Sequence, residues 1–174
     1  MLTKVLSASH FGLEITPVDV EVNIYKKGFP GFNIIGLPNK AVDESRERVK
    51  TALSNSGIEF PQAKIVVNLA PADIPKEGAG FDLPIAIGIL ASMGAVNIPE
   101  DSIFFGELSL DGGLRHTKGV FLLAVGAKKL KLKHVFVPRA SSSEGSVVKD
   151  INVYPVESFM DLVMHLNEVE LITP

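Results

Sequence analysis

The sequence predicts an α/β domain in which an N-terminal antiparallel hairpin is followed by βαβ units that build a mixed sheet. Three observations support this fold class. Apolar and polar residues alternate over 18–25 as in a strand, and strand-like and helix-like segments alternate from Lys64 onward. A chain of 174 residues suits one domain with one core, and it contains no repeat or internal linker. We therefore expect residues 1–174 to form a single domain.

Composition excludes several functional classes. Apolar residues make up 46% and charged residues 21% of the chain, as in globular rather than disordered proteins. The absence of cysteine excludes thiol catalysis and suits a reducing cytoplasm, and the four histidines lack metal-site spacing. Because the formal net charge is −3, binding to nucleic acid would need a local basic patch. No apolar run is long enough to span a bilayer, so we expect a cytoplasmic protein without a membrane partner.

The alternation in 18–25 predicts a half-buried strand whose inward residues are Val18, Val20, Val22 and Ile24. Glycine and proline in 26–31 favour a turn after this strand. The apolar segment 32–35 is then expected to return antiparallel to the first strand. The two strands together form the predicted hairpin.

The apolar spacing in 41–56 predicts a helix that ends before Gly57, with a buried face formed by Val42, Val49, Ala52 and Leu53. Glu44 and Arg48 lie four residues apart and can pair across one turn. We interpret the charged surface of this helix as a solvated face. The alternative is a partner or nucleic-acid surface built from Arg46, Arg48 and Lys50.

The middle of the sequence predicts a buried strand, a loop and a buried helix. The β-branched run 64–69 lies between prolines and indicates the strand. After a loop over 70–80, the segment 83–93 is apolar nearly all round, which is typical of a helix at the centre of a domain. Asp82 is predicted to cap this helix.

A further strand is predicted over 103–108, followed by a tight turn at 111–113 and a return strand near Leu114. An amphipathic helix follows over 120–130, and its end is crowded with Lys128, Lys129, Lys131 and Lys133. Because cations complement the dipole at a helix C-terminus, we interpret these lysines as structural. The alternative is a docking site for an acidic partner.

The last part of the sequence predicts two more strands and a closing helix. Strands are expected over 134–138 and 151–154, separated by a loop or short helix over 141–148, and the amphipathic helix covers 158–167. Alternation of strands and helices implies crossover connections and at least partly parallel pairing.

The loop over 75–82, which leads into the buried helix, is the strongest local candidate for a binding site. Its glycines Gly78 and Gly80 permit close approach of the backbone, and a helix N-terminus presents N–H groups that attract anions. An ordinary strand-to-helix connection is the alternative interpretation.

Several short motifs, taken together, resemble the N-terminal domain of the YifB/ComM family of magnesium-chelatase-related AAA+ proteins. The motifs are Gly36-Leu37-Pro38, Glu44-Ser45-Arg46-Glu47-Arg48, Asn68 to Gly78, Phe81 to Ala86, Gly106 to Gly112 and Leu114-Arg115. The resemblance covers essentially all 174 residues.

The resemblance implies a fold similar to the proteolytic domain of Lon, the C-terminal domain of RadA and the second domain of the ribosomal small-subunit protein five. Lon proteases use a serine and lysine dyad, but the corresponding positions here are Gly80 and Phe121, with Lys118 about one helical turn earlier. Because nucleophilic catalysis needs a nucleophile within reach of its base, we expect no catalytic residue in this chain. A peptidase with a rearranged site, using Ser109 and Lys118, is the disfavoured alternative.

No ATP-binding P-loop is present, since the sequence contains no Gly-Lys pair. In the resembled family this motif lies in the following AAA+ module, which would bind ATP and Mg in a parent protein expected to be hexameric. The resemblance therefore implies a non-catalytic accessory domain, without cofactor or metal of its own, of a ComM-like ATPase in DNA processing or branch migration. The chelatase name reflects similarity of the ATPase module only. Direct DNA binding by this domain is an alternative.

The motifs place six candidate interface residues around the degenerate dyad positions, namely Lys76, Glu77, Asp82, Glu107, Arg115 and Lys118. Their expected partner is the AAA+ module or another protein. Structural roles are the alternative, with Asp82 as a helix cap and Glu107 as a buried hydrogen-bond acceptor. Direct DNA binding would instead use the basic residues of 46–50 or of 128–133, and its affinity would fall steeply with salt.

Overall fold

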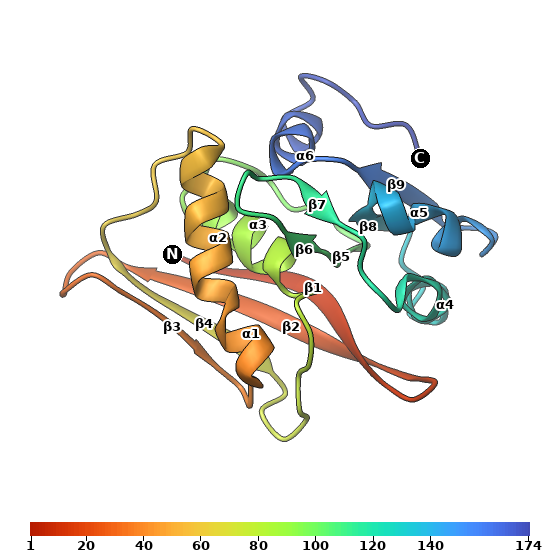
Figure 1. Ribbon diagram of the computed structural model, residues 1–174, viewed down its shortest axis with the longest axis horizontal. Coiled ribbons are helices and arrows are strands. Elements are labelled where there is room, and N and C mark those ends of the chain that lie inside the picture. Colours follow the sequence, from red (N-terminus) through yellow and green to blue (C-terminus); the bar gives the residue numbers. More distant parts are fainter.

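The structure, a computed structural model, describes all residues 1–174 and contains two main sheets with helices packed on them (Figure 1). Its elements are β1 (Leu2–Phe11), β2 (Glu14–Tyr25), β3 (Gly31–Ile35), α1 (Lys40–Asp43), α2 (Ser45–Asn55), β4 (Lys64–Ala70), α3 (Asp82–Ser92), β5 (Ser102–Phe104), β6 (Glu107–Leu108), β7 (Leu114–Arg115), α4 (Val120–Lys129), β8 (His134–Pro138), α5 (Arg139–Ser146), β9 (Asn152–Val156) and α6 (Phe159–Leu166). None of the helices combines the length and the apolar character that a membrane span requires.

The first sheet has the strand order β1-β2-β4-β3 and begins with an antiparallel hairpin, as expected. The hairpin, however, consists of β1 and β2, in register from Leu2 opposite Asn23 to Phe11 opposite Glu14. The expected pairing of 32–35 with 18–25 is wrong, because β3 pairs in parallel with β4, and β4 lies between β3 and β2. The fully buried residues of β4 explain this central position, namely Ile65, Val67 and Leu69.

Helices α2 and α3 cover one face of this sheet (Figure 1). The helix expected over 41–56 is divided at Glu44 into α1 and α2, and its predicted buried residues are buried. Every residue of α3 is buried, which confirms that this helix lies at the centre of the domain. The prediction that Asp82 caps α3 is wrong, because Phe81 holds the cap position and Asp82 begins the helix.

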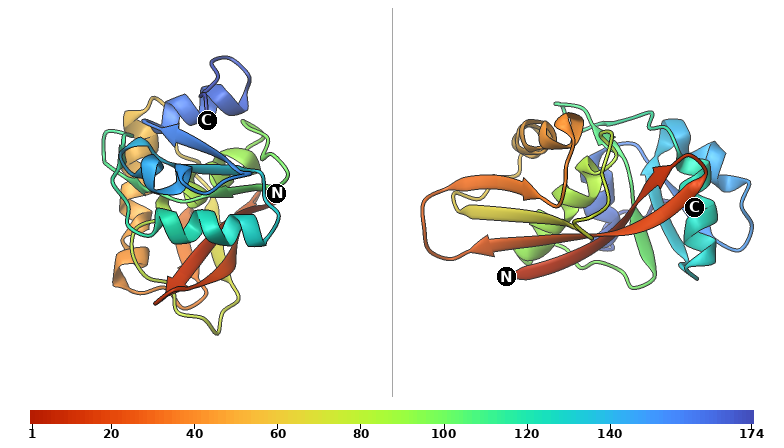
Figure 2. Two further views of the ribbon diagram at one scale, coloured as in Figure 1. Left: turned by 90° about the vertical axis from the view of Figure 1, so that its right-hand side faces the viewer. Right: turned by 90° about the horizontal axis from the view of Figure 1, so that it is seen from below.

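The second sheet joins β5, β8 and β9 in parallel, which confirms the predicted crossover connections. Phe104, Phe136 and Tyr154 form a stacked row across it, with ring centroids 4.7 and 4.6 Å apart. This row packs into the main core, whereas Ile103, Val135 and Val153 pack with residues of α4. Figure 2 shows that the long β1–β2 hairpin reaches from the first sheet to α4 at the other end of the molecule.

The strand expected over 103–108 is divided into β5 and β6, which belong to different sheets. The chain turns at Gly106, whose N–H donates to the carbonyl of Gly80 and whose carbonyl accepts from the N–H of Leu83. These bonds attach the chain at Gly106 to the start of α3. The chain beyond Gly106 therefore does not continue β5, and β6 pairs with β7 instead.

Candidate functional site

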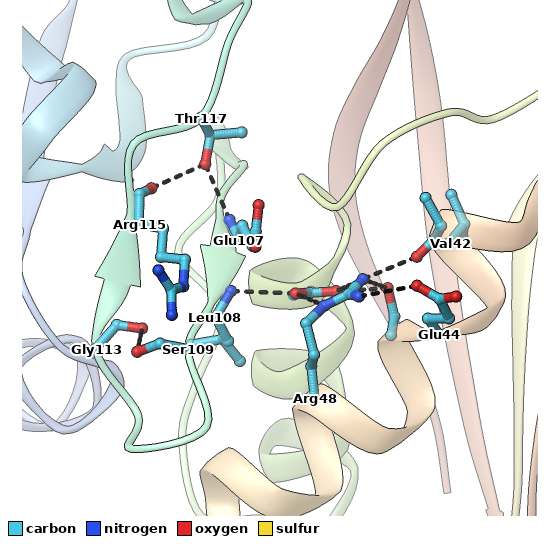
Figure 3. A network of polar contacts seen from close by, with 12 residues as sticks. Val42, Glu44, Arg48, Glu107, Leu108, Ser109, Gly113, Arg115 and Thr117 are labelled. Atoms are coloured by element: carbon cyan, nitrogen blue, oxygen red, sulfur yellow. Dashed lines mark hydrogen bonds and ion pairs between the residues drawn. The ribbon is translucent and has the colours of Figure 1, made fainter.

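A largely buried ion pair connects α2 and α3. Arg48 donates from Nε to Asp82 Oδ2 at 2.7 Å and from Nη2 to Asp82 Oδ1 at 3.1 Å. Ser45, one helical turn before Arg48, donates its hydroxyl to Asp82 Oδ1 at 2.5 Å. The N–H of Leu108 in β6 adds a bond of 3.1 Å to Oδ2. One carboxylate therefore joins α2, α3 and β6 (Figure 3).

The protonation of Asp82 and Arg48 reflects burial as well as pairing. Burial raises the pKa of the Asp82 carboxyl, against the opposing effect of the bonds from Arg48 and Ser45. Burial alone would lower the pKa of Arg48, but the hydrogen bond and charge of Asp82 outweigh it and raise that pKa. Because a guanidinium fork, a hydroxyl and an N–H all donate to one carboxylate, the geometry stabilises the charged pair.

The β6–β7 hairpin carries the charged residues Glu107 and Arg115, and Lys118 follows it in the chain. The Glu107 N–H donates to Thr117 Oγ1 at 3.1 Å, and the Thr117 hydroxyl donates to the carbonyl of Arg115 at 3.0 Å. These bonds hold the hairpin together, as Figure 3 shows. The side chains of Glu107, Arg115 and Lys118 form no hydrogen bond or ion pair, so the expectation that Glu107 is a hydrogen-bond acceptor is wrong. These groups are free to contact a partner.

The turn of this hairpin is held by Ser109 and Asp111. The single proton of the Ser109 hydroxyl is shared between the Asp111 carboxylate and the carbonyl of Gly113, the latter at 3.1 Å. The Ser109 bond, followed by the N–H of Gly113, lowers the pKa of Asp111. The Ser109 oxygen thus serves the turn and has no basic side chain as a hydrogen-bond partner.

The loop over 75–82 is a strand-to-helix connection rather than the candidate anion site. Lys76 is fully buried, and its ammonium donates to the carbonyls of Pro71 and Gly36, the latter at 2.7 Å. Burial lowers the pKa of Lys76. The N–H of Asp82 is bonded to the Ala79 carbonyl, and the Asp82 carboxylate adds negative charge at the helix start. Lys76 and Asp82 therefore offer no surface to a partner, whereas Glu77 is exposed.

Gly80 and Phe121, the two positions that the resemblance relates to the Lon dyad, lie in different surroundings. Gly80 is buried, and a Cβ built on it would overlap the ring of Phe105. Phe121 lies on α4 with 46% of its surface exposed. The structure therefore leaves no room for a serine at the first position and presents an apolar ring at the second.

Several of the basic residues considered for DNA binding are already paired. Arg48 binds the buried Asp82, so its interpretation as part of a solvated helix face is wrong. Arg46 pairs with Asp43 at 3.0 Å. At the end of α4, Lys128 pairs with Asp150 at 3.0 Å and Lys133 with Asp101 at 3.6 Å. The basic residues that remain without an ion pair in these two segments are Lys50, Lys129 and Lys131.

Sequence reasoning missed the inward role of Ser45 and Arg48. The available signal was their i,i+3 spacing, which places a hydroxyl and a guanidinium on one side of α2. The partner Asp82 is 34 residues further along the chain, so no local pattern connects it to them. No cluster of three or more histidine, aspartate or glutamate side chains is placed to hold a metal ion.

Comparison with known proteins gives a consistent picture. The family described as subunit ChlI of Mg-chelatase matches residues 20–141. Competence protein ComM of Haemophilus influenzae is 40% identical over 97% of this chain, and protein YifB of Escherichia coli is 45% identical over 74% of it. A Lon protease of Mycoplasmopsis agalactiae is 22% identical over 87% of the chain. The matches span 33%, 26% and 16% of those three proteins, respectively.

Proposed function

Since the chain belongs to the ChlI family of Mg-chelatase subunits, we propose that it is a non-catalytic interaction domain of a larger, Mg-chelatase-like AAA+ ATPase. The chain spans about a third of the length of the similar ComM protein, which leaves room for an ATPase module elsewhere in such a protein. ATP and Mg would bind to that module, and this domain would bind neither.

The observation that carries the non-catalytic role is the packing of Phe105 against Gly80. A nucleophile at this position would need a side chain, and even a Cβ would overlap the Phe105 ring. Nucleophilic catalysis requires the nucleophile and its base within hydrogen-bond reach. Ser109 and Lys118 are the alternative nucleophile and base. This pair is disfavoured because Ser109 donates to Asp111 and Lys118 forms no hydrogen bond.

The fold we propose in finer detail is that of the Lon proteolytic domain and of the second domain of the ribosomal small-subunit protein five. The distant Lon similarity and the sequence motifs support this assignment. Fold alone does not carry function, so the shared fold does not restore a protease activity that lacks its residues.

The interaction surface we propose consists of Glu77, Glu107, Arg115 and Lys118. All four lie around the dyad positions implied by their motifs, and the side chains of Glu107, Arg115 and Lys118 form no hydrogen bond or ion pair within the domain. A charged surface of this kind is typical of contacts between domains of one chain, which are more polar than permanent interfaces. Its partner would be the AAA+ module of a hexameric, ComM-like parent that acts in DNA processing or branch migration.

The proposal is tested by mixing this chain with the separately produced remainder of the parent protein and measuring binding by calorimetry. The charge reversal Arg115→Glu/Lys118→Glu is expected to weaken binding at least tenfold, as for like-charge juxtaposition at an interface. Lys129→Glu/Lys131→Glu, a reversal of two exposed lysines at and just beyond the end of α4, is the matched control. Equal loss in both variants, or no binding by the unmodified chain, would contradict the proposed surface.

A second assay tests the non-catalytic part. Casein and fluorogenic peptides should remain uncleaved by the unmodified chain. Turnover that disappears in Lys118→Ala would instead establish the rearranged peptidase.

Direct DNA binding is the second candidate function. The paired state of Arg48, Arg46, Lys128 and Lys133 argues against the two surfaces first considered for it. Any such binding has to come from lysines that are not already paired.

A further inference from the structure

One end of the domain gathers unpaired lysines and exposed aromatic rings. The β2–β3 connection at residues 26–30 and the α2–β4 connection at 56–63 lie together at this end (Figure 1). The first connection contains Lys26 and Lys27, both exposed, and Phe29, which is 92% exposed. We call this region, with Tyr25, Lys50 and Lys64 beside it, the lysine end.

The four lysines lie on both sides of this end of the sheet. Tyr25 and Lys64 point away from the buried face of β2 and β4, whereas Lys50 belongs to α2, which covers that face. Lys64 lies directly opposite Tyr25 in the β2–β4 ladder, and its ammonium is 5.3 Å from the centre of the Tyr25 ring. Lys50 lies 5.9 Å from the Phe60 ring. Lys50 and Phe60 line an open hollow of about 160 Å³ together with Pro30, where the first connection ends.

The charge of the lysine end is opposite to that of the whole protein. None of its four lysines takes part in an ion pair, and Glu59 is the one carboxylate in the two connections. The chain as a whole carries a formal net charge of −3. A positive region on a protein with net negative charge attracts polyanions to that region. The negative charge of the remaining surface repels them, so binding elsewhere is disfavoured.

Exposure of Phe29 indicates which polyanion fits. Covering a solvent-exposed phenyl ring with a flat apolar surface lowers the free energy. Unpaired nucleobases offer such a surface. Bases inside a duplex already stack on one another and cannot cover the ring. Phosphates of the same strand would contact Lys26 and Lys27 in the connection that carries Phe29, and Lys64 at the start of β4.

We propose that the lysine end binds single-stranded nucleic acid without sequence preference, with a base stacked on Phe29 and phosphates at the surrounding lysines. This inference goes beyond the proposed interaction with an AAA+ module and uses none of its residues. It also differs from the surfaces first considered for DNA, because Arg46, Arg48 and the α4 lysines take no part.

The test is fluorescence anisotropy of a labelled oligo-dT strand with the unmodified chain over a range of salt concentrations. Phe29→Ser should weaken binding on the order of tenfold, the effect of losing one stacking platform. Lys26→Ala/Lys27→Ala should reduce the slope of log affinity against log salt by about 1.4, since each phosphate contact contributes about 0.7 for a single strand.

Matched controls lie at the opposite end of the molecule. Phe11→Ser removes an equally solvent-facing ring, which is 88% exposed, and Lys129→Ala/Lys131→Ala removes two unpaired lysines. Both controls should bind within about twofold of the unmodified chain. A thermal unfolding curve for each variant distinguishes loss of the site from loss of the fold.

Three outcomes would overturn the inference. The first is absence of binding at low salt, and the second is an equal loss of affinity in the controls. The third is equally tight binding of polyglutamate or of anionic lipid vesicles, abolished by Lys26→Ala/Lys27→Ala but unaffected by Phe29→Ser. That result would identify an electrostatic surface without base stacking.

Discussion

Arg48 and Asp82 meet face to face between α2 and α3, with the side chain of Asp82 fully buried and that of Arg48 only 19% exposed. Arg48 also donates to the carbonyl of Ala41 at 2.8 Å, which connects the first turn of α1 to the same cluster. The pair thus connects the two helices that cover the first sheet with the start of the β6–β7 hairpin. Because the pair holds β6 through the Leu108 N–H, it helps to position the charged residues of that hairpin.

Removal of one member of this pair should strongly destabilise the domain. Asp82→Ala leaves a guanidinium without its carboxylate, and a broken buried pair costs about 3–5 kcal/mol. Urea unfolding measures this loss. Arg46→Met is the matched control, because its exposed pair with Asp43 contributes only about 0–1 kcal/mol. The double variant Arg48→Met/Asp82→Asn should lose less than the sum of the single variants, and additive losses would show that the two groups are not coupled.

Restoring the Lon nucleophile should not restore activity. In Gly80→Ser the new side chain has to displace the Phe105 ring, and overpacking of this kind costs about 1–3 kcal/mol. We expect a lower unfolding temperature and no cleavage of a fluorogenic peptide. Gly80→Ser combined with Phe105→Ala should relieve the overlap but leave a cavity. A Gly80→Ser variant as stable as the unmodified chain would contradict the packing described here.

Stability should fall in mildly acidic solution because of His165. Burial, with the charge of His134 as a smaller contribution, lowers the pKa of His165 below 6.5. Its Nδ1 accepts a bond from the Ile172 N–H at 3.0 Å, and protonation of that nitrogen would break the bond. The unfolded state then binds more protons than the folded state, so stability is complete above pH 6.5 and declines as the pH falls toward the folded pKa.

The free energy of urea unfolding, measured between pH 7.5 and about 5, tests this dependence. The variant His165→Gln keeps a side-chain acceptor but does not titrate, so its profile should be flatter than that of the unmodified chain. An unchanged slope in this variant would assign the dependence to other groups.

The turn of the β6–β7 hairpin offers a test of local electrostatics. Because the Ser109 hydroxyl is the main cause of the lowered pKa of Asp111, Ser109→Ala should move that pKa back toward its ordinary value. A carboxyl-carbon NMR titration of Asp111 measures the change directly. Substitution of the nearby exposed Ser54 by alanine, which removes a bond to Lys50 only, should leave the titration as it was.

Much of the secondary structure could be predicted because it depends on local periodicity. The alternation of Val18, Val20 and Val22 and the apolar composition of 83–93 correspond to a half-buried strand and a buried helix. The errors concern pairing. Nothing local distinguishes a β3 that returns on β2 from one that pairs with β4, because the decision depends on a strand some 30 residues further along.

The sequence by itself determined the fold class, the membership in the ChlI family and the presence of Gly80 and Phe121 where the resemblance to Lon would call for serine and lysine, since each depends on residue identity and short-range spacing. Only the tertiary structure decided which charged residues are available to a partner. It buried Lys76 and Asp82, paired Arg48, and left Arg115 and Lys118 exposed. The physical reason is that a charge is either neutralised in the interior or solvated at the surface, and that choice depends on residues far away in the sequence.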